Sequence, residues 1–447
     1  MNQKIPFLFL LLGLSALLLG AFFGVLITLQ YIYPEFLKET LAFNRLREFH
    51  VSTVIGWIIL SATGGIYYYI SKVLNVQLYS KKLMTIQFST LLICSLAIYY
   101  SFLFGKMGGR EYLTYHPIIS LPILIAWILF AINYFKTLVG KIQNWPVYLW
   151  MWGTGIVFMI YHFSEAHLWL IPSVRENFIR DITVQWKSYG SFVGSWNMLI
   201  YGTAIFLMSK IKNENTVGRG KVAFFFYFLG LSNLMFGWAH HTYFIPTQPW
   251  IRIVAYAMSM SEWIIFLSII ISWKKSLNQQ DKIKGNFAYK FLLATDFWVF
   301  VNLFIALLIS IPYINLFTHG THITVAHSMG TTIGINTSIL LASAMFIAFK
   351  ENAAIIETNA KIMKIGYWLF NSSLVGFLTM LMLGGVEKSK WMFLGDKTTS
   401  FSQMQDSIQP IIVVFLFFGI ALFIGLLLIA IPIIKVFLNK VRKEKSL

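Results

Sequence analysis

Apolar stretches recur along the whole chain, and each is long enough to cross the hydrocarbon core of a bilayer, which takes about 20 residues. We place twelve of them at 7–31, 51–72, 84–104, 117–136, 147–170, 188–209, 221–243, 252–273, 288–313, 322–349, 364–385 and 408–438. Such runs satisfy their backbone polar groups in lipid by forming helices. The sequence therefore predicts an all-α integral membrane protein of about twelve transmembrane helices.

The composition excludes an ordinary soluble domain. Hydrophobic residues make up 57% of the chain and charged residues only 12%, whereas about a quarter of a soluble domain is charged. The longest polar loops, near 171–187, 274–287 and 386–407, are too short to fold alone. We predict a single membrane-embedded domain over residues 1–447, with membrane lipid as its surroundings.

The net charge of +18 is distributed as in a membrane protein. Its basic residues gather in alternate loops, at Lys81, Lys82, Lys141, Lys210, Lys212, Arg219, Lys221, Lys274, Lys275, Lys282, Lys284, Lys350, Lys361 and Lys364, with the C-terminal "KVRKEKSL" on the same side. Basic loops stay in the cytoplasm, so we expect both termini there and no nucleic-acid partner. The lone Cys94 excludes a disulfide framework and a C-x-x-C-H haem attachment.

In this topology all nine histidines fall in the outer half of the bilayer or at its outer edge, which suggests one shared site. The stretch "THGTHITVAHSMGTT" (318–332) alone carries three of them and a methionine. They could be satisfied core groups, a proton relay or metal ligands. His327 and Met329 are two residues apart and point about 200° apart around a helix, so they could serve two haems on opposite sides, because both residue types ligate haem iron.

Five segments carry a resemblance to a known family. They are "LREFHVSTVIGWIILSATGGIYYYI" (46–70), "GGREYLTYHP" (108–117), "HHTYFIP" (240–246), "YAMSMSEW" (256–263) and "FTHGTHITVAHSMG" (317–330). In this order they resemble the catalytic subunit of the haem–copper oxidase superfamily, specifically the large subunit of cytochrome c-dependent nitric oxide reductase. The resemblance implies the subunit I bundle and a place in the bacterial cytoplasmic (inner) membrane.

The resemblance also implies roles for particular residues. It makes His327 the proximal ligand of a high-spin haem b and His50 an axial ligand of a low-spin haem b. His240 and His241 become ligands of a non-haem iron, or of copper. Arg47 would pair with haem propionates, Glu111 would help hold a calcium ion, and Glu262 matches a buried catalytic glutamate.

The chain departs from the family pattern at the positions of several ligands. Met329 replaces the second histidine of the low-spin haem, and we expect it to ligate in its place. Tyr189 replaces a histidine ligand of the non-haem metal, which makes it a candidate metal ligand and catalytic residue. Val193, Asn197 and Thr114 stand where the family has glutamates. The family's proton path from the outer side therefore lacks these carboxylates here.

Three polar residues near the outer surface, His162, Glu165 and Lys187, receive no role from the resemblance. His162 and Glu165 lie one helical turn apart and face the same side. The two side chains could form an ordinary hydrogen-bonded pair. Alternatively, they could relay protons. We predict that Lys187 is an interfacial residue that snorkels to the surface.

We predict a membrane haem oxidoreductase that reduces nitric oxide to nitrous oxide. Its electrons would come from a cytochrome c-type or cupredoxin donor, as a partner subunit or a soluble protein, and its substrate is a gas. The alternatives are an O2 reductase, an NO dismutase-like enzyme, and a non-catalytic haem protein that transfers electrons or senses gas.

Overall fold

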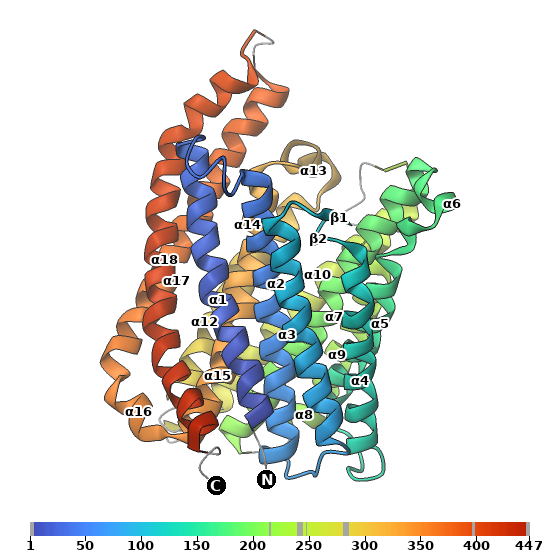
Figure 1. Cartoon of the computed structure of the whole chain (residues 1–447), viewed down its shortest axis with the longest axis vertical. Coiled ribbons are helices and arrows are strands. Elements are labelled where there is room, and N and C mark those ends of the chain that lie inside the picture. The colour runs from blue at the N-terminus through green and yellow to red at the C-terminus, as the bar shows by residue number, and fades with distance from the viewer. Residues whose placement is uncertain are drawn as a thin grey trace.

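The computed structural model describes residues 4–213, 216–238, 245–246, 248–279, 286–395 and 398–443. Its long helices are α1 (Lys4–Ile32), α2 (Phe43–Tyr68), α3 (Lys81–Leu103), α4 (Ser120–Leu138), α5 (Val147–Glu165), α7 (Phe178–Lys212), α9 (Lys221–Phe236), α10 (Pro249–Ser276), α12 (Asn286–Ile309), α15 (Ser338–Glu351), α17 (Ala360–Phe393) and α18 (Phe401–Lys443). They run side by side along the long axis of the molecule (Figure 1). The predicted all-α membrane bundle is confirmed.

Most of the shorter elements lie at the two ends of the bundle, whereas α14 (His322–Met329) and η5 (Gly330–Thr337) form the first part of the span that α15 completes. The others are η1 (Tyr69–Val73), β1 (Met107–Arg110), β2 (Leu113–Tyr115), η2 (Pro117–Ile119), η3 (Leu168–Leu170), α6 (Pro172–Arg175), α8 (Thr216–Arg219), α13 (Pro312–Thr318) and α16 (Ala353–Thr358). Figure 1 places both chain ends at one end of the bundle, and the β1–β2 hairpin, α6 and α13 at the other, here called the far end. Termini on the same side require an even number of crossings.

Each of the twelve predicted segments contains a helix, although two of them are shorter than expected. Within the described ranges ten helices, counting α14 to α15 as one, are long and apolar enough to span a membrane. The other two are α5, with 19 residues, and α9, with 16. The segment 147–170 is shortened because α5 ends at Glu165 and a 3-10 turn follows. The segment 221–243 runs into 239–244, which lie outside the described residues.

The predicted polar loop at 171–187 is wrong in its second half, because α7 already begins at Phe178. The Asn177 side chain caps this helix by accepting a hydrogen bond from the backbone amide of Arg180 at 3.0 Å. Because α7 begins this early, its first turns lie at the far end, beside the hairpin and the end of α5. Several polar side chains of α7 are therefore within reach of both.

The histidine-rich segment is not one uniform helix. Thr321 caps α14 by accepting from the amide of Ile323 at 3.2 Å. Directly after Met329 the backbone widens into the π-helix η5, and α15 continues from Ser338. Such π segments inside α-helices are rare and often occur at functional sites. The widened turn begins just beyond the last histidine of the motif.

Candidate haem and metal site

His50 has the hydrogen bonding expected of an axial haem ligand. It lies on α2, and its Nδ1 is 2.7 Å from the carbonyl oxygen of Gly20 on α1. Because a carbonyl can only accept, Nδ1 carries the proton and Nε2 keeps its lone pair for a metal. A Cβ added at Gly24 would come within 3.2 Å of the His50 Cε1 atom, so α1 approaches the ring closely. These residues fit the ligand role.

His327 and Met329 both lie on α14, so the helical spacing that turns them to opposite sides applies. The Met329 side chain is partly buried and packs against the apolar core. Behind the pair, the amide of Asn302 on α12 donates to the Thr331 hydroxyl at 2.6 Å, and this hydroxyl lies 3.3 Å from the His327 carbonyl oxygen. Haem ligation by His327 and Met329 stays a prediction.

Arg47 and Glu111 come together at the far end of the bundle. The Arg47 guanidinium donates to Glu111 at 2.5 Å and to Glu48, its sequence neighbour, at 2.7 Å. The Glu48 carboxylate is buried, and the Thr114 hydroxyl donates to its other oxygen at 2.5 Å. Thr114, which stands where the family has a glutamate, therefore stabilises a carboxylate from another element.

The hairpin explains how Glu111 reaches Arg47. Strands β1 and β2 pair Arg110 with Leu113, so Glu111 and Tyr112 form the turn between them. Tyr112 holds φ at +65°, a left-handed conformation that side chains other than glycine seldom adopt. The Arg110 guanidinium anchors the hairpin to α7 by donating to Asp181 at 2.9 Å. Burial raises the pKa of the Tyr112 phenol, and the Glu111 carboxylate raises it further.

Sequence reasoning missed Glu48 as part of this group. The signal was available in "LREFH", where a carboxylate stands at the start of an apolar segment beside an arginine. Glu48 and Glu111 supply carboxylate oxygens of the kind that calcium prefers, but both are bound by Arg47 here. Two carboxylates meet only part of the roughly six to eight oxygens of a calcium site, and the guanidinium of Arg47 already occupies one oxygen of each.

We expect Arg47→Ala to lower the free energy of unfolding by about 1–3 kcal/mol, because it removes the cationic partner of the buried Glu48 and leaves only the Thr114 hydroxyl. Adding Glu48→Gln should recover part of the loss, a coupling that a double-mutant cycle isolates. Thermal unfolding of the single and double variants in one detergent measures the loss and the recovery. Lys38→Ala is the matched control, since Lys38 pairs with Glu35 on the surface, where such pairs contribute about 0–1 kcal/mol. Equal effects at Arg47 and Lys38 would contradict the expectation.

Tyr189 lies on α7 beside the hairpin. Its ring packs edge-on against Tyr112, with centroids 5.5 Å apart. The side chain is 2% exposed, and its hydroxyl makes no hydrogen bond within the described part of the chain. A buried phenol of this kind can accept a ligand or a water molecule. The other two candidate metal ligands, His240 and His241, lie outside the described residues.

Glu262 is a buried carboxylate inside a span. It lies on α10, is 7% exposed, and accepts a hydrogen bond from the Asn233 amide of α9 at 2.5 Å. A Cβ added at Gly230 would come within 3.0 Å of its Oε1, so α9 approaches it closely. Sequence reasoning missed Asn233. Asn197, at another position where the family has a glutamate, accepts from the Asn336 amide of η5 at 3.0 Å and joins α7 to the histidine-rich segment.

No group of three or more His, Cys, Asp or Glu side chains is placed to hold a metal ion within the ranges that the structure describes. The described candidates lie on separate elements instead. His50 is on α2, Tyr189 on α7, Glu262 on α10, and His327 with Met329 on α14.

Comparison with known proteins gives a consistent family. The family model for cytochrome c and quinol oxidase polypeptide I matches residues 4–432. A nitric oxide reductase subunit of Stutzerimonas stutzeri is 22% identical over 81% of this chain and 80% of its own length. The Cbb3-type cytochrome c oxidase subunit CcoN1 of the same organism is 21% identical over 92% of this chain and 90% of its own length.

A solved structure agrees with these relatives in fold. A heme-copper terminal oxidase dimer, studied by cryo-electron microscopy, superposes with a TM-score of 0.77 at 14% identity. The match covers 98% of this chain and 84% of the oxidase chain. At this identity the likeness concerns the fold alone, and it extends over almost every helix described above.

Proposed function

The chain belongs to the cytochrome c and quinol oxidase polypeptide I family, and from this premise we propose that it reduces nitric oxide to nitrous oxide. The family makes it a membrane oxidoreductase that binds haems and a metal at a binuclear site. The likeness to the nitric oxide reductase subunit supports the choice of nitric oxide. Two molecules of NO, two electrons and two protons would give N2O and water.

We assign the cofactor roles as the sequence predicts them. His327 would hold the high-spin haem b, and His50 with Met329 the low-spin haem b. His240, His241 and Tyr189 would hold the non-haem iron or copper. When bound, these groups would bind nitric oxide and pass on the electrons of the donor, and the chain's own side chains must deliver the protons.

The buried Glu262 carries this proposal. A carboxylate in the middle of a span is costly and marks a functional site by default. Its partner Asn233 stands seven residues before His240, at the end of the helix that leads into the proposed metal ligands. The carboxylate can hold a proton and release it at this point, which is the role of a general acid.

We expect Glu262→Gln to slow NO consumption by about 100-fold or more, the range of general acid–base contributions. Glutamine keeps the side-chain volume and can still accept from Asn233, but it carries no transferable proton. Haem content should stay unchanged, and the rate is measured with an NO electrode and a chemical reductant. Glu387→Gln, at an exposed carboxylate paired with Lys390, is the control. A wild-type rate in Glu262→Gln would remove the carboxylate from the mechanism.

A second candidate is reduction of O2 or dismutation of NO. The observation that favours it is the buried Tyr189, a phenol in place of a histidine ligand, whose hydroxyl forms no hydrogen bond among the described residues. The likeness to the Cbb3-type oxidase subunit points the same way. A third candidate is a non-catalytic haem protein that transfers electrons or senses gas, which the missing carboxylates at Val193 and Asn197 favour.

One purification separates the three. Haem, iron and copper per chain are measured first, and then NO and O2 consumption with a reductant. N2O produced without O2 uptake supports nitric oxide reduction. O2 uptake, or O2 release from NO, supports the second candidate. Two haems with no third metal and no gas turnover support the third.

The proposed setting is the bacterial inner membrane, with both termini in the cytoplasm. Lys81 begins α3, Lys141 follows α4, Lys212 ends α7 and Lys350 lies in the last turn of α15. The alternation of the spans puts these helix ends on the side of the termini, where basic residues are expected to gather. The electron donor would be a cytochrome c-type or cupredoxin protein, as a partner subunit or in solution. It would dock at the far end, where the hairpin carries Arg110 and Glu111.

A further inference from the structure

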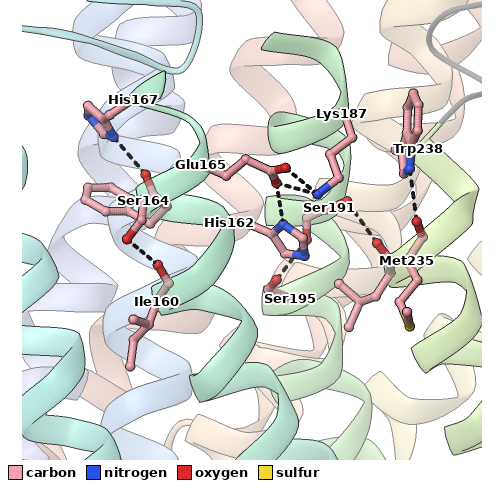
Figure 2. Close-up of polar contacts among 12 residues, drawn as sticks. Ile160, His162, Ser164, Glu165, His167, Lys187, Ser191, Ser195, Met235 and Trp238 are labelled. Atoms are coloured by element: carbon pink, nitrogen blue, oxygen red, sulfur yellow. Dashed lines mark hydrogen bonds and ion pairs between the residues drawn. The ribbon is translucent and has the colours of Figure 1, made fainter. Parts of the chain in front are cut away.

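Three charged or titratable side chains form a cluster at the far end of α5 and α7 (Figure 2). Lys187 Nζ lies 2.6 and 2.5 Å from the two carboxylate oxygens of Glu165, and the carboxylate lies 2.9 Å from His162 Nδ1. The predicted interfacial position of Lys187 stays a prediction. The structure adds a pairing with Glu165, because α7 extends far enough to bring Lys187 against α5. The predicted His162–Glu165 pair is confirmed.

The exposed fraction of the three side chains falls from the surface to the interior. The side chain of Lys187 is 19% exposed, that of Glu165 is 16%, and that of His162 only 2%. The rings of Phe158 and Tyr161 pack against the imidazole. Water can therefore reach the carboxylate, whereas the imidazole lies behind it in the protein.

The second ring nitrogen of His162 faces inward. Nε2 is buried and makes no hydrogen bond within the described ranges. Leaving such an atom unsatisfied costs about 1–3 kcal/mol, so it calls for a partner such as a water molecule. Figure 2 shows Ser195 and Ser191 of α7 beside this side of the ring.

A seam lined by these serines and by Met198 continues toward Glu262. Ser195 donates to the Ser191 carbonyl at 2.8 Å, and the Ser191 hydroxyl donates to the Leu234 carbonyl of α9 at 2.9 Å. One turn further along the same face of α7, Met198 meets Gly230, the residue that also lies against Glu262. This seam between α5, α7 and α9 lies between His162 and the Asn233–Glu262 pair. Its hydroxyls end on backbone carbonyls and Met198 is apolar, so protons would cross it on water molecules.

We propose that Glu165 and His162 are the outer part of a proton route that supplies Glu262. The inference rests on the proposed function, since reduction of either gas consumes protons. In the resting cluster Nδ1 donates to the ionised carboxylate. The carboxylate takes a proton from water, tautomer exchange moves the ring proton from Nδ1 to Nε2, and the carboxylic acid then gives its proton to Nδ1. The imidazolium releases the Nε2 proton to the seam, so one proton enters, one leaves, and the carboxylate is ionised again. Lys187 positions the carboxylate.

The test compares Glu165→Gln and His162→Gln with His167→Gln. His167 lies at the same end of α5 but bonds to the Phe163 carbonyl at 2.7 Å instead of to Glu165. We expect the first two variants to lose about 10-fold or more in gas consumption, to gain a larger solvent deuterium isotope effect, and to keep both haems. Glu165→Asp should restore part of the rate, and His167→Gln should behave as wild type.

The outcomes separate this inference from the proposed function. If the wild type consumes gas and Glu165→Gln and His162→Gln keep its rate and isotope effect, only the proton route is overturned. If those variants lose haem, the cluster is structural and the route is again overturned. If the wild type consumes neither gas, both proposals fall together.

Discussion

Replacing His327 with glycine is expected to remove one of the two haems and to lower gas consumption by roughly 100-fold or more, because an axial ligand matters at least as much as the residues that merely orient it. The haem would lose its only protein ligand under the proposed assignment. Pyridine haemochrome analysis should fall from two haems per chain to one. Added imidazole should restore part of the missing haem, since glycine leaves space for the ring.

The control for this change is Ser328→Gly. Ser328 is the next residue of α14, so its replacement carries the same helix cost of about 1 kcal/mol without touching the proposed ligand. This variant should keep both haems and full activity. Two haems per chain in His327→Gly would show that His327 is not the ligand.

The membrane spans were predictable because an apolar segment in lipid can satisfy its backbone polar groups in few conformations. A run of about 20 apolar residues must be helical, and each of the twelve predicted runs contains a helix. The ends were less predictable, since they depend on local partners. Asn177 caps α7 well before the predicted span begins, and the turn at Glu165 ends α5 early. Hydropathy carries no information about such caps.

The candidate site was predictable where helical spacing alone decides. The spacing of His162 and Glu165 gave their contact, and His327 and Met329 lie on one helix as expected. Contacts between distant elements were not predictable. The Arg47–Glu48–Glu111 group depends on the left-handed turn at Tyr112, and the Lys187–Glu165 pair depends on where α7 begins. The π-helix after Met329 left no signal in the residue pattern.

Met329 gives the second large expected effect. If it ligates the low-spin haem opposite His50, Met329→Leu should keep the packing volume but remove the sulfur from the iron. We expect the low-spin spectrum of that haem to disappear. Electron entry from the donor should slow by about 10- to 100-fold, the loss typical of a perturbed metal site. Absorption and EPR spectra of the reduced and oxidised protein measure the first effect, and stopped-flow reduction the second.

Met329→His is the matched variant, because it restores a ligand of the type that the family uses at this position. A thioether raises the potential of a haem relative to an imidazole. The variant should therefore recover the low-spin spectrum at a potential lower by on the order of 0.1 V, within the roughly 0.8 V range that axial ligands control. A redox titration followed at the low-spin absorption band measures this shift. If leucine leaves spectrum and potential unchanged, Met329 only packs against the core, and the second ligand of His50's haem must come from another residue.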